Sequence, residues 1–431
     1  MARVPLARNR VLFAALSALS ALPVLSSPLA AQASAPKKVG LPLQPARSAK
    51  FTTTQGTWMS VDVSPDGATL VFDLLGDLYT LPAAGGTATR LTSGMAYDAQ
   101  PRYSPDGRWL AFVSDRNGAN NLWIMSVDGK ESRLLSDRRE DDFISPEWTP
   151  DGKYVIVSRN GKLWMYDITG GAGVLVTRAP GPQWYFGATF GPDPRYVYYA
   201  MRIGPWQYNA AMPQFQLGVY DRETGTTSSV SNRYGSAFRP AISPDGKTLV
   251  YASRDGQQTG LRTRDIASGV EKWLIFPITR DNQEAIPDMD AIPGYSFTPD
   301  GGAIVMSHGG EFWRVPMSGA APVKIPFTAE VDVAVGPEVK FEYPIEDTPT
   351  FNARQIRDAV PSPDGKRIAF TALDRIYVAD LAGGTPRRVT TDNVGEYYPA
   401  WSPDGAQIAY VTWTDEGGYL MKVSAAGGTP V

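Results

Sequence analysis

One four-residue motif, Ser-Pro-Asp-Gly or a close variant, recurs along the chain and constrains the fold more than any other feature. Seven copies begin with Ser or Thr, and a degraded eighth, Gly191–Pro194, lacks the final glycine. Successive copies stand 40 to 64 residues apart, and recurrence on this scale is typical of one structural unit repeated in an array. The regular copies are Ser64–Gly67, Ser104–Gly107, Thr149–Gly152, Ser243–Gly246, Thr298–Gly301, Ser362–Gly365 and Ser402–Gly405.

Each copy is predicted to be the turn of a β-hairpin. Proline presets φ at about −65°, aspartate bonds locally to the backbone, and glycine accepts the conformation that reverses the chain. The flanking residues alternate between apolar and polar, as in Trp58–Val63 before the first turn and Thr69–Phe72 after it. Such alternation is typical of half-buried strands. We therefore interpret the repeated aspartates as turn residues rather than as calcium ligands or acid–base groups.

The remainder of each repeat predicts two more strands. In the second repeat, Leu122–Val127 follows a short loop, Asp128-Gly129 provides another turn, and Ser132–Leu135 gives a short fourth strand. Four strands per repeat are the pattern of a propeller blade, and blades stack radially because one blade alone cannot bury both of its faces. The chain is therefore predicted to be all-β, a β-propeller of four-stranded antiparallel blades.

The number of rings follows from comparing two segments, residues 49–93 and 339–391. Both have Lys-Phe near their start and an unusually short loop between their second and third strands. We therefore predict a six-bladed propeller over residues 49–335 and the first two blades of a second, incomplete propeller over 336–431. One eight-bladed ring is the alternative. Ring closure is expected to pair the two chain ends within one blade, which removes exposed sheet edges. The last repeat stops before its fourth strand, which favours a fragment of a longer protein.

The first 33 residues have the pattern of a secretory signal peptide. Three arginines precede an apolar run, Val11–Leu25, and Ala31-Gln32-Ala33 fits the small-x-small cleavage pattern. Residues 34–48, rich in proline and alanine, are predicted to form a flexible leader. We expect an exported protein, periplasmic or secreted, with no membrane span after signal removal. The net charge is −3 and the sequence has no stripe of basic residues, so nucleic acid is not an expected partner.

The order of the motifs resembles the TolB-type β-propeller repeat over nearly the whole mature chain. The segments FTTTQGTWMSVDVSPDG, FDLLGDLYTLPAAGG, IPFTAEVDVAVGP and RDAVPSPDGKRIAFTALDRIYVADLAGGTPRR are similar to the N-terminal propeller region of secreted bacterial amidohydrolases. This resemblance implies a hydrolase of C–N bonds other than peptide bonds. It also implies a metal-dependent catalytic barrel after the propellers, so catalytic residues and a divalent metal are expected beyond Val431. No catalytic residue, metal ligand or cofactor is assigned within the present chain.

Two roles remain open for the propeller on this evidence. It either gates or orients substrates for an intramolecular catalytic domain, or it works as a non-enzymatic TolB-like periplasmic module that binds a peptide or protein ligand. A propeller that caps a serine peptidase is a third, less favoured interpretation.

Few residues outside the turns carry recognisable chemistry. The single histidine, His308, is interpreted as a polar turn residue. Aromatic and amide side chains near the degraded turn are candidate binding residues because such groups can hold a peptide or an amide substrate, and inter-blade packing is the competing interpretation. These candidates are Trp184, Tyr185, Trp206, Tyr208 and Asn209. The insertion at residues 277–293 is interpreted as a lid, a partner contact or a tolerated long loop.

Overall fold

The computed structural model describes residues 44–431, except 178–183, 206–210, 286–288, 339 and 346. The chain divides into two compact units, residues 1–339 and 340–431. All regular secondary structure of the described residues is β-strand, and no helix among them is long and apolar enough to cross a membrane. The predicted signal peptide lies outside the described residues, whereas the end of the predicted leader forms the start of strand β1 (Arg47–Thr53).

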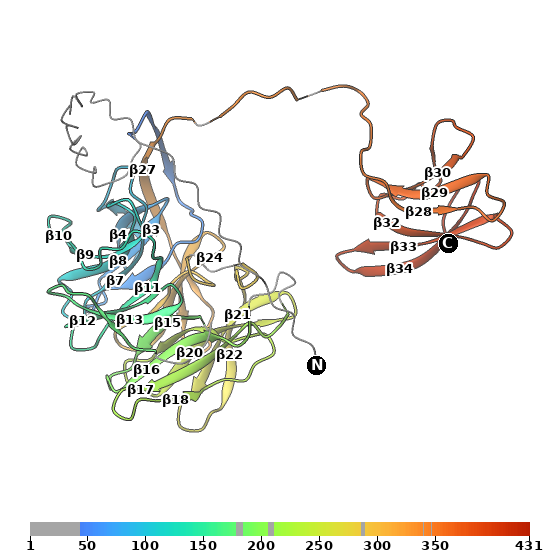
Figure 1. Cartoon of the computed structure of the whole chain (residues 1–431). Helices are drawn as coiled ribbons and strands as arrows, with labels where there is room; N and C mark the ends of the chain where they lie inside the picture. Colours follow the sequence, from blue (N-terminus) through green and yellow to red (C-terminus); the bar gives the residue numbers. More distant parts are fainter. Residues whose placement is uncertain (1–43, 178–183, 206–210, 286–288, 339, 346) are drawn as a thin grey trace, which may run out of the picture. The chain divides into compact units, whose positions relative to one another are not determined.

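The first unit contains six four-stranded antiparallel sheets, each built from one contiguous stretch of chain (Figure 1). Each sheet contacts the next, and β23 and β24 of the sixth contact β2 of the first. The six sheets therefore close a ring, and the alternative of a single eight-bladed ring is excluded. The first blade consists of β2 (Val61–Val63), β3 (Thr69–Leu74), β4 (Asp77–Pro82) and β6 (Thr89–Arg90), and the second of β7 (Asp98–Tyr103), β8 (Trp109–Ser114), β9 (Asn121–Ser126) and β10 (Ser132–Leu134). The third consists of β11 (Phe143–Trp148), β12 (Tyr154–Arg159), β13 (Lys162–Asp167) and β14 (Val174–Leu175), and the fourth of β15 (Tyr185–Phe190), β16 (Tyr196–Arg202), β17 (Phe215–Asp221) and β18 (Thr226–Ser229). The fifth consists of β19 (Phe238–Ile242), β20 (Thr248–Asp255), β21 (Gln258–Asp265) and β22 (Glu271–Ile278), and the sixth of β23 (Ser296–Phe297), β24 (Ala303–His308), β25 (Glu311–Pro316) and β26 (Val323–Ile325).

The repeated turns join the first two strands of each blade and also connect neighbouring blades. In the second blade, Asp106 Oδ1 accepts hydrogen bonds from the Ser104 hydroxyl (2.6 Å) and the Arg108 amide (3.1 Å). Gly107 has a φ of +70°, and a Cβ added there would lie 3.6 Å from Cδ of Pro65 in the preceding turn. The same contact recurs between Gly67 and Pro299, Gly152 and Pro105, Gly246 and Pro192, and Gly301 and Pro244.

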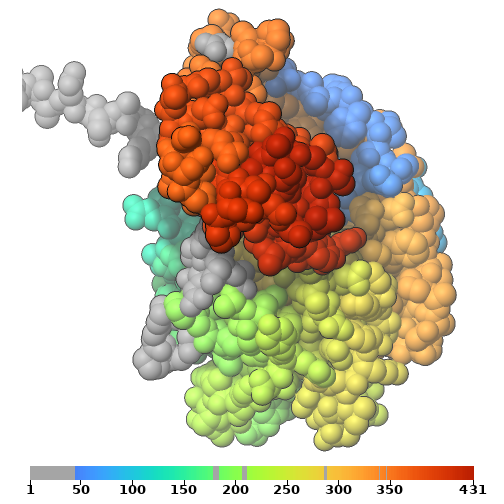
Figure 2. Space-filling view, turned by 90° about the vertical axis from the view of Figure 1, so that its right-hand side faces the viewer, coloured from blue at the N-terminus to red at the C-terminus, as the bar shows by residue number. Residues whose placement is uncertain are grey.

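The apolar core lies between blades, as the alternation of each strand requires. Where the sixth blade meets the first, the fully buried ring of Phe72 stacks on Tyr79 with centroids 5.6 Å apart. Edge contacts to Phe312 of β25 (4.8 Å) and to Phe327 (5.6 Å) complete this cluster. Burying an aromatic side chain of this size contributes roughly 1.5–3 kcal/mol. In the space-filling view the fourth blade (light green) and the fifth (yellow) lie side by side (Figure 2).

The innermost strands of the second to fifth blades each contain a β-bulge, which lies five residues before the turn proline. The bulged residues have left-handed φ values of 56° at Gln100, 55° at Ser145, 59° at Gly187 and 52° at Arg239. A bulge redirects its side chain from the regular alternation of the strand. It therefore places the polar side chains of Gln100, Ser145 and Arg239, all buried, along the inner side of the ring.

The expectation that the ring closes within one blade was wrong. Strand β1 pairs antiparallel with β27 (Phe327–Val335), and β27 pairs in parallel with the short strand β5 (Gly86–Thr87), so the first and last strands of the first unit meet in a separate three-stranded sheet (Figure 1). The physical reason is that the first blade obtains all four of its strands from one stretch of chain and has no place for β1.

The second unit, residues 340–431, contains two sheets packed against each other. Val378, Ile408 and Tyr410 form part of their shared core. The backbone of Val431 pairs with that of Lys422 on the outer strand. The strands are β28 (Arg357–Pro361), β29 (Arg367–Ala372), β30 (Arg375–Asp380) and β31 (Arg387–Arg388) in the first sheet, and β32 (Gly395–Trp401), β33 (Gln407–Thr414) and β34 (Gly417–Ser424) in the second.

Candidate functional site

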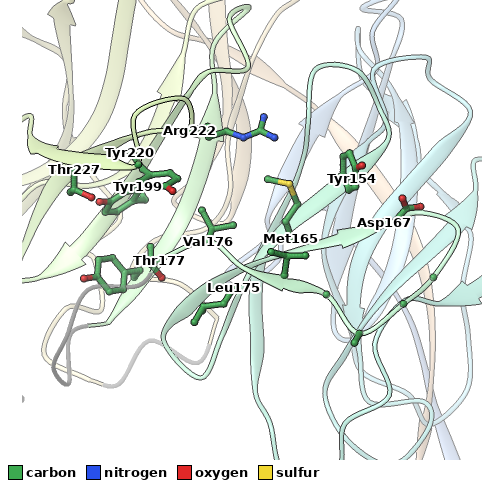
Figure 3. Close-up of a pocket in the computed structure, with 17 residues that line it drawn as sticks. Tyr154, Met165, Asp167, Leu175, Val176, Thr177, Tyr199, Tyr220, Arg222 and Thr227 are labelled. Carbon is green, nitrogen blue, oxygen red and sulfur yellow. The ribbon is translucent and has the colours of Figure 1, made fainter.

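A cleft of about 1030 Å³ lies between the third and fourth blades (Figure 3). Strands β12, β13 and β14 supply one wall, and β16, β17 and β18 supply the other. Met165 and Arg222 reach into the space from opposite blades (Figure 3). The main side chains that line the cleft are Tyr154, Met165, Val176, Tyr185, Tyr199, Tyr220, Arg222 and Thr227.

The cleft exists because the outer edge of the third blade is thin. Strand β14 has only two residues, and the segment before it, Gly170–Gly173, contains no side chain larger than a methyl group. Gly173 has a φ of +75°, and a Cβ added there would lie 2.7 Å from the ring of Tyr166. A larger residue at this position would therefore displace the strand. Because the segment has only small residues, the space between it and the fourth blade stays unfilled.

Two buried tyrosines form the deepest part of the wall. The rings of Tyr185 and Tyr199 meet edge to face with centroids 5.4 Å apart. Tyr199 lies across Gly218, where an added Cβ would approach its ring to 2.9 Å. Burial raises the pKa of Tyr185 and of Tyr199, so both phenols stay neutral near pH 7. Both rings are almost completely buried and held by their neighbours, so they give the wall a rigid backing.

The cleft also contains one charge of each sign. Arg222 is exposed, and its Nη1 donates to the carbonyl of Pro194 at 2.9 Å. Asp167 accepts hydrogen bonds from the Thr169 hydroxyl (2.7 Å) and amide (2.8 Å), which lower the pKa of its carboxyl group. An aromatic wall with a guanidinium and a carboxylate beside it suits a ligand that has apolar and polar groups along its length.

The structure places the sequence-predicted binding residues in different locations. Tyr185 lines the cleft, whereas Trp184 packs on the hairpin turn of the third blade, where a Cβ at Gly161 would lie 2.7 Å from its ring. Trp206, Tyr208 and Asn209 lie outside the described residues.

Sequence reasoning missed three further tyrosines of the cleft, Tyr154, Tyr199 and Tyr220. They occupy ordinary alternating strand positions, and the sequence has no signal that distinguishes them from packing residues.

His308 ends strand β24 beside the insertion. Its Nδ1 accepts a hydrogen bond from the Thr279 amide (3.0 Å), its carbonyl accepts one from Trp313 Nε1 (3.1 Å), and burial lowers the pKa of the imidazole. A smaller hollow of about 420 Å³ lies here, bordered also by Gln55 and Trp58. Among the described residues, no three His, Cys, Asp or Glu side chains are grouped so that they could hold a metal ion.

A cluster of charged side chains lies on the inner side of the ring, away from the cleft. Arg102, a buried residue of β7, has its Nη1 3.3 Å from Asp62 Oδ1 and its Nε 3.5 Å from Glu147 Oε2. Burial raises the pKa of Glu147 against the opposing effect of Arg102. The three charges come from three consecutive blades, so they tie the inner strands together.

The insertion at 277–293 is neither a lid over the surface nor a loose loop in its described part. Gln283, Asp290, Ala291 and Ile292 are buried, and Gly294 donates a backbone hydrogen bond to Ser60 Oγ (3.0 Å) in the first blade. The insertion fills the ring from one side. This burial could not be predicted, because the polar composition of the insertion is typical of exposed loops.

The fold and the cleft define a β-propeller with a ligand-sized opening between two blades. Residues 58–203 match the model of the tricorn protease N-terminal β-propeller domain. This match lies within the first unit and agrees with its β-propeller fold.

Other known proteins are similar over limited stretches. The uncharacterized protein Atu1656 of Agrobacterium fabrum is 36% identical over 106 residues, 23% of this chain and 36% of that protein. The uncharacterized peptidase YuxL of Bacillus subtilis is 28% identical over 175 residues, 39% of this chain and 23% of that protein. The chain thus spans well under two thirds of each relative. The structure of a putative TolB from Agrobacterium tumefaciens aligns with a TM-score of 0.46 and 19% identity, over 59% of this chain and 95% of that chain.

Proposed function

We propose that the first unit binds an extended peptide segment in the cleft between the third and fourth blades. The observation that carries this proposal is the position of β14, which lines the cleft and is the outermost strand of its sheet. Its outer side has no strand partner among the described residues. An extended peptide can add to such an edge through main-chain hydrogen bonds, while neighbouring pockets select its side chains.

The tyrosines of the cleft suit this role. Half-buried Tyr220 offers a large, amphipathic ring that loses little conformational entropy on binding, and buried Tyr199 packs behind the wall. Arg222 supplies an exposed cation for an acidic group of the ligand, and Asp167 supplies an anion for a basic one. Peptide recognition by backbone pairing plus aromatic contacts needs no cofactor, and none is part of this proposal.

We further propose that the chain is the propeller region of an exported, amidohydrolase-like hydrolase of C–N bonds other than peptide bonds. The support is the resemblance of the segments around the first blade, β27 and the second unit. In this proposal residues 336–431 begin a second propeller, the protein acts in the periplasm or outside the cell, and residues beyond Val431 provide catalysis and hold a divalent metal. The alternative is a non-enzymatic TolB-like interaction module, and peptide binding in the cleft is common to both.

Selection of short random peptides on the purified chain tests the cleft. Tyr220→Ala is expected to weaken the selected peptides by about tenfold in fluorescence anisotropy, a loss typical of an aromatic contact at a binding hot spot. Tyr234→Ala is the matched control, because Tyr234 is 81% exposed and lies outside the cleft. Equal binding by wild type and Tyr220→Ala, with both chains folded by circular dichroism, would place the peptides elsewhere and reject the cleft.

A separate assay tests the hydrolase. The complete gene product, purified from the periplasm, is given a panel of N-acyl amino acids and cyclic amides with and without a chelator. Hydrolysis that a chelator abolishes and a divalent metal restores is the expected result. No hydrolysis of any substrate, with peptide binding intact, would favour the TolB-like module.

A further inference from the structure

A shallow pocket of about 400 Å³ lies where the outer parts of the fourth and fifth blades meet. One wall is the end of β18 and the chain that follows it, Ser229–Arg233, and the other wall is formed by Arg264 of β21 and Glu271 of β22. This outer pocket faces solvent and is built only from described residues, so a small ligand can enter it without any movement of the chain.

Positive charge exceeds negative charge around the outer pocket. Arg233 Nη2 and Arg264 Nη1 (2.8 Å) both donate to the carboxylate of Glu271, one to each oxygen. The Glu271 side chain is 8% exposed, so one buried carboxylate is shared by two guanidinium groups. A third guanidinium, that of Arg262, lies 3.7 Å from the centroid of the Trp273 ring. Burial lowers the pKa of Arg262, and the positive charge of Arg233 lowers it further.

Several donors of these arginines are unused. Nε and Nη1 of Arg233 and Nε and Nη2 of Arg264 make no hydrogen bond to another described residue. Nε of Arg262 is buried without a partner, and so is the hydroxyl of Tyr251, the residue directly opposite Arg262 in the pairing of β20 with β21. Besides Glu271, the described acid whose charge acts on Arg262 is Asp255, which is exposed to water. Buried donors without partners cost free energy, and an anion beside them lowers that cost.

The cationic groups are held in place before any ligand arrives. Gln216 fixes the main chain of Arg233, because its Nε2 donates to the Arg233 carbonyl (2.6 Å) and its Oε1 accepts from the Arg233 amide (3.0 Å). The turn after β21 confines Arg264, since a Cβ added at Gly269 would lie 3.2 Å from Nη2 of that arginine. Asn232 is exposed and adds an amide to the same wall as Arg233. A preorganised set of donors binds a ligand at a smaller entropic cost.

We propose that the outer pocket binds a phosphate group, as the free ion or as a monoester. Three guanidinium groups against one carboxylate leave two positive charges (3 − 1 = 2), which matches the phosphate dianion. Guanidinium donors from both walls, with the amide of Asn232, suit a group that has three terminal oxygens better than they suit a planar carboxylate. The site is independent of the cleft and of the function proposed for it.

Isothermal titration calorimetry of the full chain at pH 8 and constant ionic strength tests the site. The ligands are inorganic phosphate, glycerol 3-phosphate and, as the monoanionic control, acetate. A Kd of about 1 mM is expected for the phosphate ligands, and acetate is expected to bind at least about tenfold more weakly. Tighter binding of glycerol 3-phosphate than of inorganic phosphate identifies the monoester as the ligand, and the reverse order identifies the free ion. No binding of either phosphate, or equal binding of acetate, overturns the site.

Four variants separate a binding role from a structural one. Arg233→Gln and Arg264→Gln are each expected to weaken phosphate binding about tenfold, because each removes charge-assisted donors. Arg314→Gln is the matched control, since it removes one positive charge from a 48% exposed side chain outside the pocket. Glu271→Gln removes the internal anion and keeps its shape, and it is expected to tighten phosphate binding about tenfold.

Circular dichroism checks that each variant is folded. A purely structural role of the Arg233–Glu271 pair predicts no gain of phosphate affinity in Glu271→Gln, so equal Kd values in that variant and wild type overturn the proposal. If Glu271→Gln does not fold, Arg233→Gln decides the question, because the Arg233 side chain is 36% exposed and its loss empties no core site. An effect of Arg314→Gln as large as that of Arg233→Gln would show attraction by overall charge and would likewise overturn the site.

Discussion

The ring of Phe370 stacks on that of Tyr377 in the second unit, with centroids 5.9 Å apart and an angle of 16° between the planes. Phe72 and Tyr79 form the same pair in the first blade, at the same distances in sequence from the turn proline. The first pair is completed by Phe312 and Phe327. The second pair has no further aromatic contact among the described residues. Phe72 therefore belongs to a cluster of four aromatic rings, whereas Phe370 belongs to a pair.

This difference predicts unequal effects of the same substitution. Phe72→Ala is expected to lower the free energy of unfolding of the first unit by about 3–5 kcal/mol, because it empties a fully buried site. Phe370→Ala is expected to cost the second unit clearly less, because fewer neighbours lose contact. Hydrogen exchange followed by mass spectrometry reports on peptides of each unit separately and measures both values in the full chain. Equal losses of unfolding free energy in the two units would contradict the argument that Phe370 has fewer aromatic neighbours than Phe72.

The turn glycines are expected to tolerate asparagine better than alanine. Gly107→Ala is expected to cost about 1 kcal/mol, because alanine disfavours the left-handed φ of +70° even though its Cβ would meet Pro65 at an ordinary distance. Gly107→Asn is expected to cost less, because asparagine adopts this conformation more readily. Gly204→Ala serves as the control, since an added Cβ there has no atom of the described residues within 4 Å. Urea unfolding of the three variants checks the order, and a loss at Gly204 equal to that at Gly107 would rule out backbone conformation as the cause.

The turn aspartates predict a loss of stability in acid. The hydroxyl of Ser104 lowers the pKa of Asp106 from 3.8, and the corresponding hydroxyls lower the pKa of Asp66 and Asp245. A lowered pKa in the folded state means that the ionised form is the stabilised one, so this contribution is present above about pH 4 and is lost as the pH falls further. The urea midpoint is expected to drop between pH 5 and pH 3. Asp106→Asn is expected to reduce the drop, and an unchanged drop would assign it to other groups.

Asp73 predicts the opposite dependence at higher pH. Burial raises the pKa of Asp73 to about 7, although the amides of Gln100 and Ser60 each donate to it at 2.7 Å. A raised pKa favours the protonated form in the folded state, so this contribution is fully present below about pH 4 and is lost as the pH rises through 7. The loss amounts to at most about 4 kcal/mol.

Unfolding in urea at pH 5, 6, 7 and 8 measures this effect. Wild type is expected to lose stability across the series, and Asp73→Asn is expected to be less stable at pH 5 but nearly independent of pH. Asp255→Asn, at an exposed aspartate, should follow wild type. A variant at Asp73 that keeps the full pH dependence would show that another group titrates.

The blades were predictable because their determinants are local. Ser104–Gly107 contains its own turn chemistry, and strands β7 and β8 follow from it without reference to the rest of the chain. Even the degraded turn at Gly191–Pro194 lies between two paired strands. Just after it, the bidentate pair of Arg195 with Asp221, at 2.9 and 2.6 Å, ties the start of β16 to the end of β17.

The candidate sites were less predictable because they depend on distant partners. Arg233 pairs with Glu271 across 38 residues, and no local pattern around either residue indicates the other. The cleft arises from the shortness of β14 and from glycines that resemble ordinary turn residues in the sequence. Tyr185 was selected for its aromatic neighbours, but its place in the cleft depends on Tyr199, a residue that alternation alone would assign to the core.

The sheet of β1, β27 and β5 gives the first unit a fastening that is separate from its blades. Every blade stays whole when β1 is removed, and the seam between the sixth and first blades is then held by the pairing of β27 with β5, by contacts such as those of Phe72 and by the bond between Gly294 and Ser60. Strand β1 therefore adds one more tie at the single place where the ring of consecutive blades closes on itself. Cleavage beside Thr53 would remove this tie and leave each of the six blades intact, so it would act on the strength of closure and not on the blades.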